Sequence, residues 1–111
     1  NMEVVMQNAI GSWNETTAGT DSGATATHAA DSDQYHIVTH VGGHVDADSI
    51  LKVLDGTTVV WESKIDISVE GFQIKSPPGL HIVCTKGNKA DFVVASSSSD
   101  CQANIGGYSI P

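Results

Sequence analysis

The chain has 111 residues, the length of a single domain, and 40% of them are hydrophobic, which excludes a disordered acidic tract. It carries 13 acidic residues against five lysines and no arginine, a formal net charge of −8 at pH 7. Proteins that bind phosphates usually present arginine-rich basic patches, so we expect no binding to nucleic acid or to an anionic membrane surface. The longest apolar runs fall well short of the ~20 residues that a transmembrane helix needs.

Residues 1–34 are predicted to form an N-terminal strand followed by an extended arm or long surface loop. Residues 3–10 alternate weakly between apolar and polar side chains, as in a strand. Residues 13–34 are rich in Thr, Ala, Gly, Ser and Asp and are too polar to pack a core. We therefore expect this stretch to become ordered only against a partner or a neighbouring subunit, with Trp13 as its anchor.

Residues 35–111 are predicted to form an all-β domain, because short β-branched runs are separated by Gly, Asp, Asn and Pro every eight to twelve residues or so. The strongest local signal is Asp55-Gly56 between the runs 50–54 and 58–63, which predicts a type I′ hairpin. Residues 65–69 alternate strictly and predict a half-buried strand. Further strands are expected at 35–41, 72–74, 80–84, 90–95 and 104–110. Seven to nine short strands indicate an antiparallel β-sandwich or jelly roll.

His36, His40 and His44 recur at every fourth residue, in and just beyond the predicted strand 35–41. Four residues of a strand span about 13 Å, so two of these rings cannot bind one zinc ion at ~2.1 Å. We expect the three histidines to share one face of the strand as a row that faces solvent or an interface. If it lines an interface, acidification through about pH 6.5 should charge the row and loosen that interface. A metal site that joins His44 to Asp46 or Asp48 is the alternative.

Other chemical motifs lead to structural interpretations. The Asp-x-Asp pairs at 31–33 and 46–48 lack the ligand spacing of an EF-hand and are assigned to turns and caps, with a weak calcium site left open. Cys84 lies in an apolar run and favours a buried free thiol, as does Cys101, although one disulfide between them stays possible. His81 lies three residues before Cys84 and points to the opposite face of the predicted strand, and the serine loop at 96–99 has no histidine or lysine nearby in sequence. We predict no catalytic residue, no cofactor and no metal.

Trp61 lies in the predicted hairpin, on the same face as Val59 and Ser63. Its ring is expected either in the core or in an interface, since large aromatic side chains supply much of the burial in small domains. The candidate interface residues from sequence are Trp13, Tyr35, His36, His40, His44 and Trp61.

The polar N-terminal region, the segment "HIVTHVGGHVDADSILKVLDGTTVVWESKIDI", the serine-rich turn and the closing "ANIGGYSIP" together resemble the small all-β decoration, or cement, proteins of tailed bacteriophage capsids. The resemblance covers about residues 35–111 and rests on general style rather than on a diagnostic motif. It implies a non-enzymatic virion protein on the outer capsid surface, commonly a homotrimer, that binds the major capsid protein across neighbouring subunits. The arm and the net charge of −8 are consistent with such a role.

A second function is compatible with the same sequence. A receptor- or glycan-binding β-sandwich at a phage tail or cell surface would use Trp61, Tyr35 or the Asp-rich loops. This alternative predicts that the arm is dispensable and that binding depends on the aromatic side chains.

Overall fold

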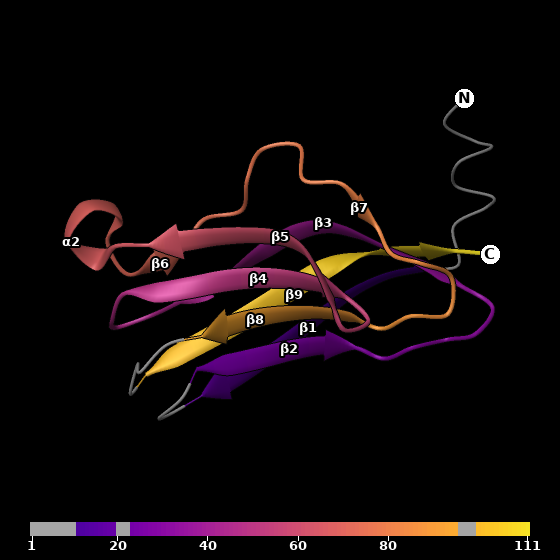
Figure 1. Cartoon of the computed structure of the whole chain (residues 1–111), viewed down its shortest axis with the longest axis horizontal. Coiled ribbons are helices and arrows are strands. Elements are labelled where there is room, and N and C mark those ends of the chain that lie inside the picture. Colours follow the sequence, from indigo (N-terminus) through magenta and orange to yellow (C-terminus); the bar gives the residue numbers. More distant parts are fainter. Residues whose placement is uncertain (1–10, 20–22, 96–99) are drawn as a thin grey trace.

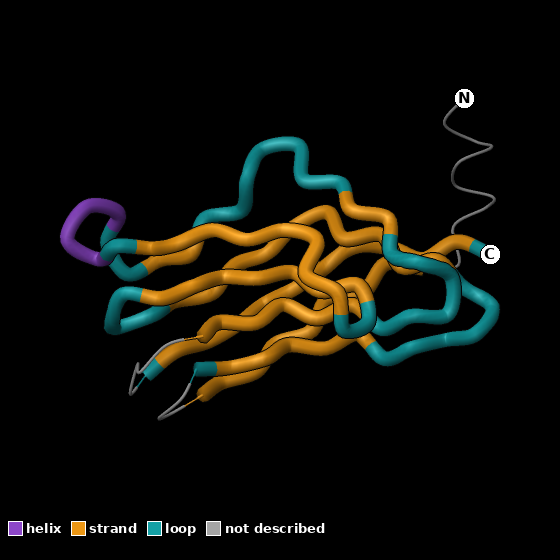
Figure 2. The backbone as a smooth tube through the Cα atoms, in the orientation of Figure 1, coloured by secondary structure: helices purple, strands orange, loops and turns teal. Residues whose placement is uncertain are grey.

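The computed structural model describes residues 11–19, 23–95 and 100–111. Within these residues strands dominate and a single helical turn lies at one end (Figure 2). The elements are β1 (Gly11–Gly19), β2 (Ala24–His28), β3 (Tyr35–His44), β4 (Ser49–Asp55), β5 (Thr58–Ile65), α2 (Ile67–Glu70), β6 (Gln73–Ile74), β7 (Ile82–Val83), β8 (Ala90–Ala95) and β9 (Cys101–Ile110). The predicted all-β class is confirmed.

Two antiparallel sheets face each other as a sandwich (Figure 1). Sheet A has the strand order β1-β9-β3-β6, and β7 also pairs with β3. Sheet B has the order β2-β8-β4-β5. The predicted sandwich architecture is therefore confirmed, and the last strand, expected at 104–110, is a ten-residue inner strand of sheet A.

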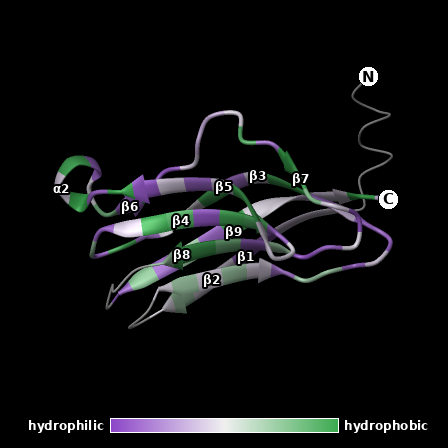
Figure 3. Ribbon diagram, in the orientation of Figure 1, coloured by the Kyte–Doolittle hydropathy of each residue, from purple (hydrophilic) through white to green (hydrophobic). Residues whose placement is uncertain are grey.

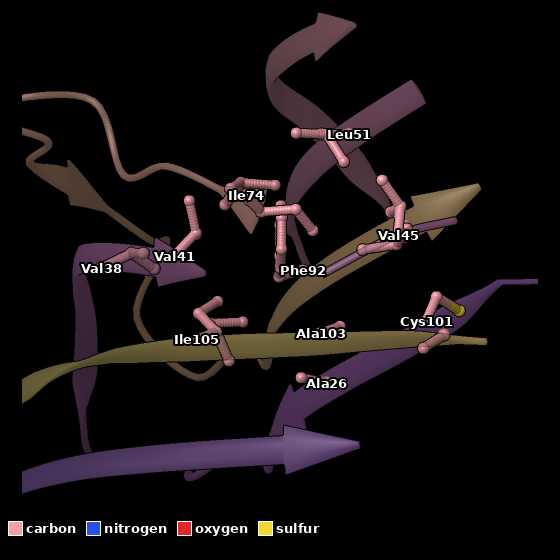
Figure 4. Close-up of a cluster of buried hydrophobic side chains, with 14 of the residues drawn as sticks. Ala26, Val38, Val41, Val45, Leu51, Ile74, Phe92, Cys101, Ala103 and Ile105 are labelled. Atoms are coloured by element: carbon pink, nitrogen blue, oxygen red, sulfur yellow. The ribbon is translucent and has the colours of Figure 1, made fainter. Parts of the chain in front are cut away.

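The hydrophobic core fills the space between the sheets (Figure 4). Val38 and Ile105 come from sheet A, and Val53 and Phe92 come from sheet B; all four are fully buried. Burial alternates along β9, where Cys101, Ala103 and Ile105 face inward and the residues between them are partly exposed. This period of two follows from the pleat of a strand and identifies the outward-facing residues used below.

The prediction of an arm or long loop at residues 13–34 is wrong for most of that stretch. Gly11–Gly19 pairs along its whole length with β9 in sheet A, and Ala24–His28 pairs with β8 in sheet B. Small and polar residues suffice here because each strand needs only one buried face, and Ala24 and Ala26 supply it in β2. The strand predicted at 3–10 lies outside the described residues.

The hairpin of β4 and β5 is confirmed, but its turn differs from the prediction. Asp55 pairs with Thr58, so the two-residue loop is Gly56-Thr57 rather than Asp55-Gly56. Gly56 has a φ of +63°, and no non-glycine residue in the described part of the chain has a positive φ. A positive φ at the first loop position alone fits a type II′ turn, whereas type I′ needs it at both positions.

The strand predicted at residues 65–69 is wrong beyond Ile65. The side chain of Asp66 accepts hydrogen bonds from the backbone N–H and the hydroxyl of Ser68, at 3.0 and 2.6 Å, and caps the short helix α2. Asp48 accepts a bond from the backbone N–H of Ile67 at 3.1 Å. The two carboxylates accept hydrogen bonds from the free backbone N–H groups at the start of the helix. This capping favours a helical turn over the strand that the alternation of apolar and polar residues predicted.

The strand predicted at 90–95 matches β8, whereas those predicted at 72–74 and 80–84 shorten to β6 and β7.

The two long edges of the sandwich differ. At one edge β1 and β2 contact each other and join the sheets. At the other, which we call the open edge, lie β5, α2, β6, β7 and the loop between β6 and β7 (Figure 1). No helix among the described residues is long and apolar enough to cross a membrane.

Candidate functional site

A bulge in β3 decides where its histidines point. Val38 pairs with Gly107 and His40 with Gly106, so Thr39 is an extra residue without a partner in β9. The bulge reverses the alternation: Val38 before it and Val41 after it both face the core. His36 therefore points inward and His40 points outward.

The predicted row of three histidines on one face is accordingly wrong, and so is the premise of its pH response. His36 is fully buried, whereas His40 is exposed. His44 is partly exposed and lies 3.2 Å from the carboxylate of Asp100, not of Asp46 or Asp48. His36 and His44 are eight residues apart, which is about 26 Å along a strand. The described residues contain no group of three or more His, Cys, Asp or Glu that could hold a metal ion.

His36 belongs to a hydrogen-bonded cluster at the end of the sandwich near the C-terminus. Its Nε2 lies 2.8 Å from the carbonyl oxygen of Ala29, and its Nδ1 lies 2.6 Å from the hydroxyl of Ser109. A carbonyl can only accept, so Nε2 carries the proton and Nδ1 of the neutral ring accepts from Ser109. Trp13 Nε1 donates to the same hydroxyl oxygen at 3.1 Å. Every polar atom of this buried ring therefore has a partner.

His28 extends the cluster toward solvent. Its ring stacks on Trp13 with centroids 4.1 Å apart and an interplanar angle of 4°, and it lies edge-on to His36 at 4.4 Å. Its Nδ1 donates to the carboxylate of Glu15 at 2.8 Å. The structure thus brings together two predicted interface candidates, Trp13 and His36. They lie in a packed end of the core, where they join β1, β2, β3 and β9, and not on an exposed surface.

The outward face of β1, β9 and β3 is the most distinctive surface of the molecule, and we call it the neutral face. Cross-strand partners share a face, so Ser12 lies beside Tyr108, Asn14 beside Gly106 and Thr16 beside Asn104. The outward-facing residues on these three strands include no Asp, Glu or Lys, although the chain has 18 such residues, 13 acidic and five basic. They are Ser12, Asn14, Thr16, Ala18, Tyr35, Ile37, His40, Gly42, His44, Gln102, Asn104, Gly106, Tyr108 and Ile110.

A shallow depression of about 520 Å³ lies in the neutral face, lined by Ser12, Trp13, Asn14, Thr39, His40, Gly107 and Tyr108. The position of the His40 ring depends on glycine: a Cβ on Gly106 would lie 2.0 Å from Cε1 of His40. The absence of a side chain at Gly106 therefore leaves room for the His40 ring against β9. The depression offers aromatic rings, hydroxyl groups and an amide, which can pack and form hydrogen bonds without burying a charge.

One polar group on this face has no hydrogen-bond partner among the described residues. It is the side-chain oxygen Oδ1 of Asn104, which is buried. A buried acceptor without a donor carries a desolvation penalty.

Trp61 lies elsewhere, whereas Tyr35 is at one end of the neutral face. Trp61 packs against the core and lines a groove of about 400 Å³ at the open edge, together with Leu51, Ser63, Lys64, Ile65, Val69, Glu70, Gln73, Lys75 and Pro77. Tyr35 begins β3, and the ammonium of Lys86 lies 5.7 Å from its ring centroid. The predicted interface candidates therefore divide between the neutral face, the buried cluster around His36 and the groove at the open edge, because the bulge turns His36 inward and the fold separates β3 from β5.

The remaining predicted motifs have structural roles. Asp31 accepts from the backbone N–H of Asp33 in a turn, and Asp48 binds the start of α2, as the assignment to turns and caps predicted. Cys84 and Cys101 are both buried and free. Burial, with a smaller contribution from the negative charge of Asp55, raises the pKa of Cys84 to about 11. The serine loop at 96–99 lies outside the described residues.

The neutral face is not predicted from the sequence. Its signal was present in the segment 11–19, where Ser, Asn and Thr alternate with Trp, Glu and Thr, but the low hydrophobicity of that segment led to the arm instead. Comparison with known proteins adds nothing to this picture: no family model, curated protein or solved structure matches the chain.

Proposed function

We propose that the protein is a non-enzymatic structural protein of a bacteriophage virion, which decorates the outer capsid surface by binding across neighbouring subunits of the major capsid protein through its neutral face. The observation that carries the proposal is the exclusion of all Asp, Glu and Lys side chains from the outward face of β1, β9 and β3 in a chain of net charge −8. We infer the identity of the partner, the capsid, from the resemblance of residues 35–111 to decoration proteins.

Electrostatics explains why such a face suits a protein partner. Charged groups are depleted at the centres of protein–protein interfaces, because removing them from water is unfavourable unless each is paired. No outward-facing side chain of β1, β9 or β3 is a carboxylate, so these strands can approach another surface without burying an acidic side chain of their own. The carboxylate of Asp100 lies beside the face and is paired with His44 at 3.2 Å. The acidic side chains elsewhere keep the rest of the molecule soluble and discourage unspecific association.

The depression adds specificity. Tyr108 and His40 offer ring surfaces for packing, and Asn14 offers an amide for hydrogen bonds. Interfaces of this composition, aromatic and polar but uncharged, are typical of stable complexes between preformed proteins.

The proposal is tested with a matched pair of threonines. Thr16 in β1 lies on the neutral face, and Thr25 in β2 is exposed on sheet B. Thr16→Glu and Thr25→Glu add the same charge on different sheets. In co-sedimentation with purified capsids of the encoding virus that were assembled without this protein, wild type and Thr25→Glu should bind and Thr16→Glu should bind at least tenfold more weakly. Equal binding of the two variants, or no binding by wild type, would contradict the proposal.

The second candidate function, a receptor- or glycan-binding head, is favoured by one observation. Trp61 lines the groove at the open edge next to the polar side chains of Ser63, Glu70 and Gln73. Aromatic rings beside hydrogen-bonding groups are a common arrangement for small polar ligands. A glycan array decides between the two: specific glycan binding that Trp61→Ala abolishes, with no capsid binding, would favour the head.

A further inference from the structure

The open edge of sheet B carries an unpaired strand. In the described part of the chain β5 pairs with β4 alone, so its other side has no strand partner. A long exposed edge can pair with another chain, and natural proteins usually cover or disrupt such edges. Val59 and Val60 on β5 are 45% and 43% exposed, and Val69 on the adjoining α2 is 79% exposed. Hydrophobic residues also colour α2 and β7 along the same edge (Figure 3).

The part of β5 that pairs regularly with β4 is a short segment centred on one residue. A register shift between Val53 and Leu54 leaves Val60 without a partner in β4, so regular pairing runs from Trp61 to Ile65. Ser63 is the middle residue of this segment. Trp61, Ser63 and Ile65 pair with Val53, Leu51 and Ser49 and face the sandwich interior, whereas Glu62 and Lys64 face outward beside Lys52 and Ile50.

The charges on this segment are self-complementary. Glu62 and Lys64 lie one residue before and one after Ser63, on the same face and with opposite signs. If two copies pair antiparallel about a two-fold axis at Ser63, Glu62 of each copy lies directly opposite Lys64 of the other. Opposite charges at directly facing positions stabilise antiparallel pairs, and like charges destabilise them.

We propose that the open edge binds a second copy of this chain, through antiparallel β5–β5 pairing about a two-fold axis at Ser63, which joins the two B sheets into one eight-stranded sheet. The pairing ends at Ile65, where each chain turns into α2. Val59 and Val60 of one copy then lie level with α2 of the other, where Val69 is exposed. This contact is isologous, as most dimer contacts are, and it differs from the three-fold cluster that the resemblance implies.

The pairing uses a different surface from the neutral face and does not depend on the proposed function. It is tested in solution without any capsid, so failure of one proposal leaves the other standing. Charge reversal supplies the variants: Glu62→Lys places two lysines opposite each other at each contact, and Lys64→Glu places two glutamates there. The double variant Glu62→Lys/Lys64→Glu restores opposite charges in the reverse order.

Light scattering after size-exclusion chromatography, over a range of protein concentrations, measures the mass of each protein. Wild type and the double variant should be dimers, and each single variant should raise the dissociation constant about tenfold or more. Lys86→Glu and Asp33→Lys, at exposed positions off this edge, match the net charges of the two single variants and should dimerise like wild type. Circular dichroism confirms that each variant is folded.

A second measurement does not depend on charge. Ser63→Cys should form a disulfide-linked dimer under mild oxidation, and Thr25→Cys on the other edge strand of sheet B should not. A wild-type protein that stays monomeric at millimolar concentration, a trimer whose mass the single variants leave unchanged, or single variants that the double variant does not rescue would each overturn the β5 pairing.

Discussion

Replacing Ser109 with alanine removes one oxygen on which two rings depend. Its hydroxyl donates to Nδ1 of His36 at 2.6 Å and accepts from Nε1 of Trp13 at 3.1 Å. His36 is fully buried, and Trp13 is half-buried. A buried polar atom without a partner costs about 1–3 kcal/mol. The His36 nitrogen bears most of that loss and the indole N–H adds a smaller one, so Ser109→Ala should lower the free energy of unfolding by about 2–4 kcal/mol.

Urea unfolding followed by tryptophan fluorescence measures this loss, since Trp13 is part of the cluster and the domain is small enough for two-state analysis. Ser12→Ala, at an exposed position of β1 next to Trp13, is the control and should change stability by less than about 0.5 kcal/mol. The double variant His36→Leu/Ser109→Ala removes both polar partners and should be more stable than Ser109→Ala alone. A loss below about 0.5 kcal/mol for Ser109→Ala would refute the assigned network.

Three further predictions concern other parts of the fold. Burial by itself would raise the pKa of Asp55, yet hydrogen bonds from Thr85 and Asn88 lower it below its usual value. The stabilisation that these bonds supply is therefore present above the pKa of the unfolded chain and is lost as pH falls through the pKa of the folded protein. Asp55→Asn should therefore lose about 1–2 kcal/mol at pH 7 and show a weaker acid dependence in urea titrations from pH 7 to 2. Gly43 has a φ of +124°, and a Cβ there would lie 1.8 Å from the backbone oxygen of Gln102. Gly43→Ala should therefore lower the free energy of unfolding by about 3 kcal/mol or more, measured by urea unfolding. Gly11→Ala, with open space around the residue, is the control and should leave that free energy unchanged. Cys84, buried and with its pKa raised to about 11, should react with a thiol reagent at pH 8 only after urea unfolding, and fast reaction of the folded protein would contradict its placement.

The sequence predicted the elements whose signal is local. The hairpin of β4 and β5 follows from a glycine turn between two β-branched runs, and β8 follows from one apolar run between two polar segments. Neither needs a distant partner to be recognised. The two-layer architecture followed from the number and spacing of such segments, since strands with one apolar face must be covered by a second sheet.

Most of the features that were missed depend on distant residues. β1 contributes few apolar side chains and is ordered by backbone pairing with β9, almost ninety residues later in the chain. The bulge at Thr39 also exists only in the pairing of β3 with β9. Because of it, His36 points into the core and His40 points to the surface. α2 was missed because the cap of Asp66 was read as one step of an alternating strand. The neutral face could not be predicted without β1, since it exists only where β1, β9 and β3 lie side by side.

Electron cryomicroscopy of capsids incubated with the purified protein shows which surface, if any, binds the capsid. If the neutral face of sheet A is the binding surface, as we propose, the outward side of β1, β9 and β3 should lie against the capsid, with Tyr108 and Asn104 in the contact and β5 directed away from it. Density that places sheet B or the open edge on the capsid, or capsids that remain bare at saturating protein, would contradict this proposal.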